Sequence, residues 1–77
     1  MAATKLYGTV VRATPAISSG PDIGAKPYMA RYANGSFAGM FASARLAQQK
    51  VEQSASQELV WIDETRNGIE AYKGLGK

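Results

Sequence analysis

Two residue types are missing from this chain of 77 residues: it has no cysteine and no histidine. Without cysteine there is neither a disulfide nor a thiolate metal site. Without histidine the chain lacks the side chain that most often acts as general base or metal ligand near neutral pH. The sequence also has no glycine-rich phosphate loop and no calcium-loop spacing. We therefore expect no enzymatic activity, no metal and no cofactor.

Long apolar runs are also missing. No stretch approaches the roughly 18 residues of a membrane span, and the start, MAATKLYG, lacks the apolar core of a signal peptide. Charged residues make up 19% of the chain, and the net charge of +3 permits an anionic partner without requiring one. We expect a single domain, residues 1–77, that is soluble in the cytoplasm and has no membrane partner.

The strongest local pattern is Asn34-Gly35, because Asn-Gly between alternating residues predicts a β-hairpin with a type I′ turn. We expect strands at 26–33 and 36–42 joined by a two-residue loop. This register sets Tyr32 opposite Phe37.

Because side chains alternate across a strand, the hairpin has two distinct faces. One face is expected to carry four aromatic side chains, Tyr28, Tyr32, Phe37 and Phe41. The other face is expected to carry Met29, Arg31, Ala38 and Met40, with the two methionines directly opposite each other.

A helix is predicted over 44–55, because Ser43 is a good N-cap and the segment contains no Gly or Pro. Its small residues form one stripe, namely Ala44, Ala47, Val51 and Ala55. A stripe of small residues lets a helix approach a sheet closely, so we place it over the aromatic face of the hairpin. The face with Met29, Arg31 and Met40 then points away from the helix.

The remaining segments complete one sheet. Residues 5–14 read as a strand in which Gly8 marks a bulge or a close backbone approach, and 16–25 read as a loop. Residues 59–64 and 69–73 form a second hairpin around Asn67-Gly68, with a two-residue loop that avoids setting two carboxylates opposite each other. Residues after 73 are expected to be a short tail.

These elements predict an α+β fold in the order β-β-β-α-β-β. An antiparallel sheet of four to five strands would carry one helix on one face.

Carboxylates gather on the second hairpin, at Glu58, Asp63, Glu64 and Glu70. Paired carboxylates can hold a hard cation or transfer protons. On a hairpin of this kind they more often form a solvated acidic surface, which is the interpretation we favour.

The segment from Lys26 to Val51, a strand pair around Asn-Gly followed by a helix after a Phe-x-Ser step, resembles the sheet-plus-helix modules of AP2-type and integrase arm-binding domains. In those domains, arginines and tryptophans on the exposed sheet face enter the DNA major groove. The resemblance therefore implies DNA binding through the sheet. Here that face offers Arg31 beside methionines instead. In size, charge and layout the chain is also similar to phage-encoded anti-CRISPR inhibitors.

We therefore expect a non-catalytic binding protein that docks on a larger protein or ribonucleoprotein assembly, for example as an anti-CRISPR-like inhibitor. Its predicted partner-binding residues are Met29, Arg31, Met40, Arg12 and Lys26. Met and Arg suit an adaptable protein interface. The alternatives are a sheet-mediated DNA-binding module and a linker or decoration protein of a large assembly. A homodimer is compatible with the same open face.

Overall fold

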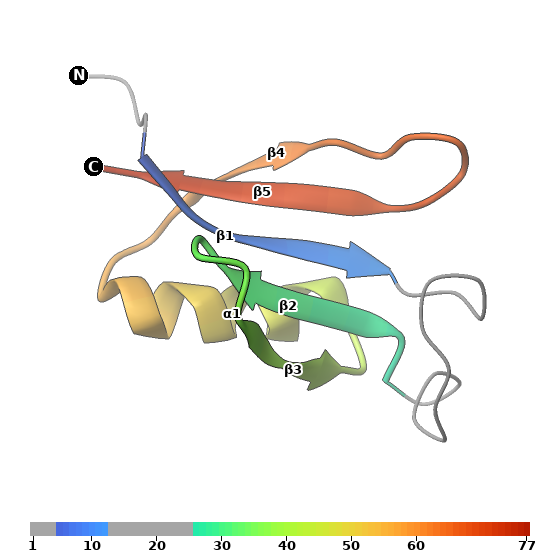
Figure 1. Ribbon diagram of the computed structural model, residues 1–77, viewed down its shortest axis with the longest axis horizontal. Coiled ribbons are helices and arrows are strands. Elements are labelled where there is room, and N and C mark those ends of the chain that lie inside the picture. Colours follow the sequence, from blue (N-terminus) through green and yellow to red (C-terminus); the bar gives the residue numbers. More distant parts are fainter. Residues whose placement is uncertain (1–4, 13–25) are drawn as a thin grey trace.

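The computed structural model describes residues 5–12 and 26–77 (Figure 1). They form six elements: β1 (Lys5–Arg12), β2 (Tyr28–Tyr32), β3 (Phe37–Phe41), α1 (Ala44–Ala55), β4 (Val60–Asp63) and β5 (Ala71–Gly76). The predicted α+β class and the order β-β-β-α-β-β are thus confirmed. The end of the predicted first strand, residues 13–14, and the predicted loop at 16–25 lie outside the described residues.

The strands form one antiparallel sheet in the order β3-β2-β1-β5-β4. β1 lies at its centre, between β2 and β5, so the first and last strands of the chain are neighbours (Figure 1). Gly74–Gly76 therefore belong to a strand, and the predicted tail was wrong for these residues. The second edge of β1 needs hydrogen-bond partners, and β5 supplies them from Lys5 to Val11.

α1 lies on one face of the sheet, over β1, β2 and β3 (Figure 1). Its two buried residues, Ala47 and Val51, pack with Val10 of β1 and Ala30 of β2. The close approach depends on Gly8, because a Cβ atom there would lie 2.6 Å from both the Arg31 carbonyl oxygen and Val51 Cγ1. Both interpretations of Gly8 are confirmed, since the β1–β5 register shifts between Leu6 and Gly8.

The start of α1 follows the predicted cap. The Ser43 side chain accepts a hydrogen bond from the Leu46 amide at 3.3 Å. The predicted small-residue stripe is also confirmed, because Ala44 and Ala55 pack against the core beside the two buried helix residues. The free energy of burying this stripe, rather than helix propensity alone, holds a helix of 12 residues in place.

The second Asn-Gly pair forms the predicted two-residue loop, as a type I′ turn. Asn67 and Gly68 have φ angles of 54° and 77°, as this turn requires at both central positions. Arg66 and Ile69 exchange both of their backbone hydrogen bonds, at 3.1 and 3.0 Å. Asp63 is therefore opposite Tyr72, so no two carboxylates face each other there, as the two-residue loop predicts.

The first Asn-Gly pair forms a different turn, and the two-residue loop predicted there was wrong. The Tyr32 amide bonds the Ser36 carbonyl, and the Gly35 amide bonds the Tyr32 carbonyl, both at 2.9 Å. Gly35 has a φ of 88°, whereas Asn34 is not at positive φ. This is a three-residue loop, a type I turn with a glycine bulge. The Ala33 amide donates to the Tyr7 carbonyl of β1 at 3.0 Å. In a two-residue loop, this amide would instead donate across the hairpin to Ser36.

A further irregularity lies between Ala30 and Arg31, where the β2–β3 register shifts by one residue. Phe37 therefore faces Arg31 instead of Tyr32, and its side chain is 56% exposed on the face away from α1. Ala38, which was predicted on the face away from α1, packs against the core instead. The predictions for these two residues were wrong because β3 contains one extra residue at the bulge. At the bulge and on its turn side, side chains of β3 point to the sheet face opposite to the one predicted.

The other three aromatic residues follow the prediction. Tyr28 and Phe41 are opposite each other and pack against the core. Tyr32 shares the face of Ala30 and is half-buried.

The bulge can be tested with two matched truncations. Phe37→Ala should lower the free energy of unfolding by less than about 1 kcal/mol, because an exposed side chain leaves no cavity. Phe41→Ala should cost about 2–4 kcal/mol, since this side chain packs against the core. Urea denaturation of both variants measures the difference, and equal losses would contradict the bulge.

Candidate functional site

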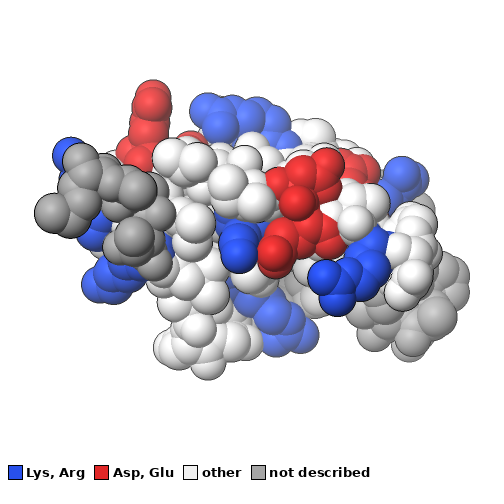
Figure 2. All heavy atoms as spheres, turned by 90° about the horizontal axis from the view of Figure 1, so that it is seen from above, with Lys and Arg blue, Asp and Glu red and all other residues white. Residues whose placement is uncertain are grey.

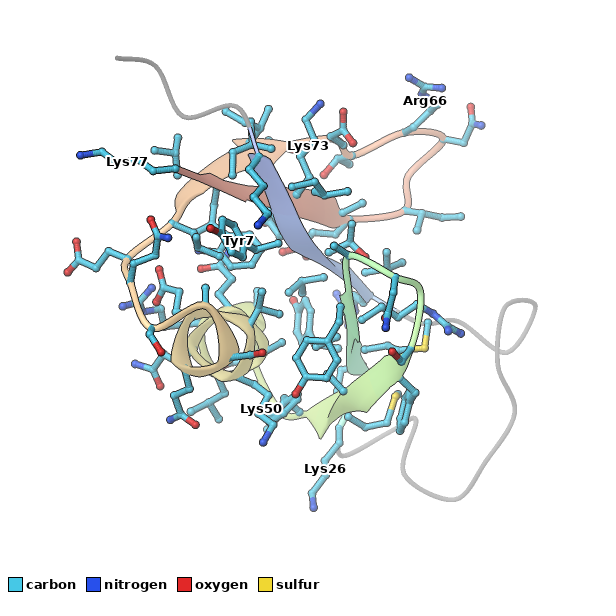
Figure 3. All side chains as sticks on the ribbon, turned by 60° about the vertical axis from the view of Figure 1, so that its left-hand side comes forward. Tyr7, Lys26, Lys50, Arg66, Lys73 and Lys77 are labelled. Atoms are coloured by element: carbon cyan, nitrogen blue, oxygen red, sulfur yellow. The ribbon has the colours of Figure 1, made fainter. Side chains whose placement is uncertain are left out.

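The sheet face away from α1 is not covered by any described element, and we call it the open face. Figure 3 shows α1 on one side of the sheet only. Strand alternation and the observed registers place the side chains of the open face in three rows that run across the strands. The middle row has one residue from each strand: Phe37, Arg31, Thr9, Lys73 and Ile62. With strands about 4.8 Å apart, it spans about 19 Å.

Two apolar rows flank the middle row. On one side lie Met40, Met29, Val11 and Ala71, and on the other lie Leu6, Leu75 and Val60. Of these, Val60 and Leu6 are 54% and 39% exposed, and Ile62 of the middle row is 39% exposed. Nine of the twelve side chains on the open face are therefore apolar and accessible in part, which is unusual for a solvated sheet face.

The charged side chains of the open face differ in their surroundings. Lys73 Nζ lies 3.3 Å from Glu64 Oε2, so a neighbouring carboxylate already balances its charge. Arg31 is exposed, and its Nη1 donates to the Gly35 carbonyl at 2.9 Å. No described carboxylate lies within 4 Å of the Arg31 guanidinium. Arg31 is thus oriented by its own hairpin and has no described counter-ion.

The structure brings together three of the five residues predicted to bind a partner. Met29 is opposite Met40, and Arg31 lies on the same face. Arg12 is opposite Tyr28 on the α1 side, with its guanidinium carbon 5.8 Å from the centre of the Tyr28 ring.

Lys26 does not join the open face either. It is exposed and precedes β2, and in Figure 3 its side chain extends away from the sheet. Arg12 and Lys26 therefore lie away from the open face, which carries Met29, Arg31 and Met40.

Sequence reasoning missed the five side chains of the open face that come from β5 and β4. Val60 and Ile62 alternate with Trp61, and Lys73 and Leu75 alternate with Gly74, so each segment has a readable two-residue period. The missing information was the strand order, because only the pairing of β1 with β5 aligns these segments with Arg31.

Two carboxylates of the second hairpin, Glu70 and Asp63, accept hydrogen bonds from within the protein. Both Glu70 carboxylate oxygens accept hydrogen bonds, one from the Tyr28 hydroxyl at 3.0 Å and one from Tyr72. Hydrogen bonds from the Thr65 side chain and amide lower the pKa of Asp63. The described residues contain no group of three metal-ligating side chains. Figure 2 shows acidic side chains near the β4–β5 side of the molecule, flanked by basic ones.

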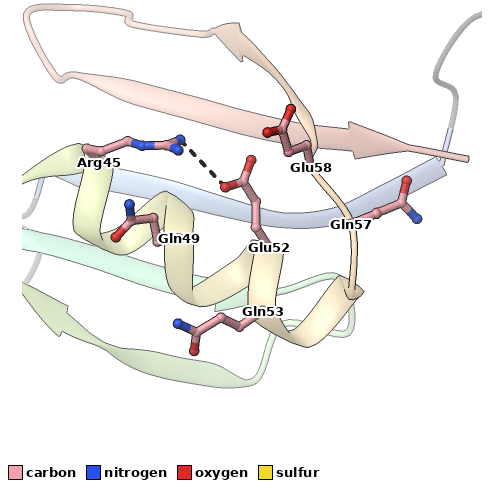
Figure 4. Close-up of a pocket in the computed structure, with 6 residues that line it drawn as sticks. All are labelled: Arg45, Gln49, Glu52, Gln53, Gln57 and Glu58. Atoms are coloured by element: carbon pink, nitrogen blue, oxygen red, sulfur yellow. Dashed lines mark ion pairs between the residues drawn. The ribbon is translucent and has the colours of Figure 1, made fainter.

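A polar hollow of about 470 Å³ lies beside α1 (Figure 4). At its wall, Glu52 Oε1 lies 3.5 Å from Arg45 Nη1. Glu52 Oε2 accepts hydrogen bonds from the Leu59 amide at 3.0 Å and from Trp61 Nε1 at 3.2 Å. The carboxylate thus ties α1 to the start of β4. Its hydrogen bonds are internal, which points to a structural role for Glu52.

The Tyr72 hydroxyl gives the fold a testable pH dependence. Its hydrogen bond to Glu70, together with desolvation, raises the pKa of Tyr72 to about 12. Between pH 10 and 12 the unfolded chain loses this proton while the folded chain keeps it, so stability should fall as pH rises. Phenolate absorbance and thermal melts of the wild type and Tyr72→Phe measure this. The variant should melt with a shallower pH slope above 10, and an unchanged slope would contradict the assignment.

No family model, curated protein or solved structure matches this chain. No helix among the described residues combines the length and the apolar character needed to cross a membrane. The open face is thus the feature on which a functional proposal can rest.

Proposed function

We propose that this chain is a non-catalytic binding protein that docks on a larger protein or ribonucleoprotein assembly through the open face. The observation that carries the proposal is the grouping of nine apolar side chains on a sheet face that no described element covers. Surface patches of this kind are typical of interaction sites. Phe, Met and Arg, which are enriched in interfaces, occur at Phe37, Met29, Met40 and Arg31.

The charges on the open face favour a protein surface over bare nucleic acid. Binding along a phosphate backbone uses a line of cations or a basic groove. Here the middle row has two cations, and Lys73 is already paired with Glu64. Apolar contact can therefore supply most of the binding energy.

A matched pair of variants tests the proposal. Phe37→Asp places a charge on the open face, and Leu46→Asp places the same charge on the outer surface of α1. The two parent side chains are similarly exposed, at 56% and 47%, so both variants should fold. Capture from an extract of cells that naturally produce the chain, followed by binding assays with each purified captured protein, measures partner binding.

We expect the wild type and Leu46→Asp to bind the same partner, and Phe37→Asp to bind it at least about tenfold more weakly, a loss of about 1.4 kcal/mol. Circular dichroism melts of all three proteins provide the folding control. If the helix variant loses the partner while the Phe37 variant retains it, α1 is the docking surface and the proposal is wrong.

A further inference from the structure

Arg31 occupies an unusual position on the open face. In the middle row it lies between Phe37 on β3 and Thr9 on β1, and Met29 precedes it by two residues on the same face of β2. Its one described hydrogen bond runs to the Gly35 carbonyl and leaves four of the five guanidinium N–H donors unused. The side chain is thus an oriented cation within a mainly apolar surface.

Covering this face would remove water from the guanidinium. A buried charge without a partner costs several kcal/mol, whereas a buried charge pair with good hydrogen bonds can stabilise a complex. No described residue places a carboxylate within 4 Å of Arg31. A partner that buries the apolar rows must therefore bring its own anion to this position.

We infer that the partner is an acidic protein surface, in which a carboxylate set among apolar side chains forms a bidentate pair with Arg31. This inference rests on the proposed function. A carboxylate matches the planar guanidinium fork. Apolar side chains around it would match Met29, Met40 and Phe37, which a row of phosphates would not.

Selection from a displayed library of random peptides provides the probe. Peptides are selected on the wild type, and those that lose binding to Phe37→Ser, a neutral substitution, are kept as ligands of the open face. We expect them to share an Asp or Glu flanked by apolar residues. Arg31→Glu should weaken their binding at least about tenfold, and Arg31→Lys should weaken it less, because an ammonium cannot form the bidentate pair. Lys26→Glu makes the same charge change away from the open face and should bind like the wild type.

A substitution in the peptide keeps the test independent of the stability of this chain. Replacing the shared acidic residue with Gln should also weaken binding to the wild type, but less than Arg31→Glu does, because Gln removes the charge pair without adding repulsion. Replacing it with Lys should restore measurable binding to the Arg31→Glu variant.

Three results would overturn the inference, and they differ in what they mean for the proposed function. Ligands of the open face without a shared acidic residue overturn the inference alone. Peptides that all bind Phe37→Ser as well as the wild type overturn the proposed function too. If a duplex or single-stranded DNA oligonucleotide displaces the peptides, and its own binding needs Arg31 and falls steeply with salt, the anion is a phosphate.

Discussion

Replacing Gly8 with valine should leave the chain largely unfolded at room temperature. The new Cβ atom would lie 2.6 Å from the Arg31 carbonyl oxygen and 2.6 Å from Val51 Cγ1. The first contact is with the backbone of the neighbouring strand, and the second is with a fully buried side chain of α1. Ordinary overpacking costs about 1–3 kcal/mol, and we expect more here because a backbone atom must move. A chain of this length has a total stability of only about 4–12 kcal/mol.

Urea denaturation followed by circular dichroism measures this effect. Gly35→Asn is the matched control, since a Cβ at Gly35 has no atom within 4 Å and Asn tolerates the positive φ of 88°. The control should stay within about 1 kcal/mol of the wild type. A Gly8→Val variant with the wild-type midpoint would mean that α1 does not pack this closely on β1.

A chain that ends at Lys73 should also fail to fold. The four residues removed include half of β5, which pairs with β1 through Gly74, Leu75 and Gly76 and with β4 through two of the same residues. Their loss would expose the backbone of the central strand and uncover Leu59 and Trp61, which pack against Gly74. Unpaired buried backbone groups and lost apolar burial act in the same direction.

The control for this deletion is Lys77→Ala. The described contacts of Lys77 with Tyr7 and Gln57 use its backbone carbonyl and amide, which the substitution retains. Lys77→Ala should therefore melt within a few degrees of the wild type, while the shortened chain shows no cooperative melt in circular dichroism. A cooperative melt of the shortened chain would show that β5 is dispensable beyond Lys73.

The two Asn-Gly pairs show how far local sequence predicts a turn. Both were predicted to form two-residue loops, and only Asn67-Gly68 does so. Near Asn34-Gly35, the Ala33 amide donates a hydrogen bond to the Tyr7 carbonyl of β1, and the loop has three residues instead of two. The same dipeptide thus adopted two turns because a neighbouring strand competed for a hydrogen bond at only one of them.

The candidate site was predictable in part for a related reason. Met29, Arg31 and Met40 were placed correctly for two local reasons. Met29 and Arg31 alternate along β2, because the extra residue lies in β3, and Met40 pairs with Met29 before the register shifts. Phe37 was misplaced because a single bulge reverses which face a residue occupies. Lys73 and Ile62 were missed because their position beside Arg31 depends on strand order.

By itself, the sequence determined the local properties of this protein: the helix with its Ser43 cap and small-residue stripe, the strand segments, and the tight turn at Asn67-Gly68. These follow from backbone preferences and from the two-residue and 3.6-residue periods, which act over a few neighbouring residues. Only the tertiary structure decided that β5 joins β1, that a bulge turns Phe37 outward, and that the three rows of the open face align. Each of these depends on hydrogen bonds and packing between segments far apart in the chain, such as Thr9 with Lys73 and Gly8 with Val51, which no local pattern encodes.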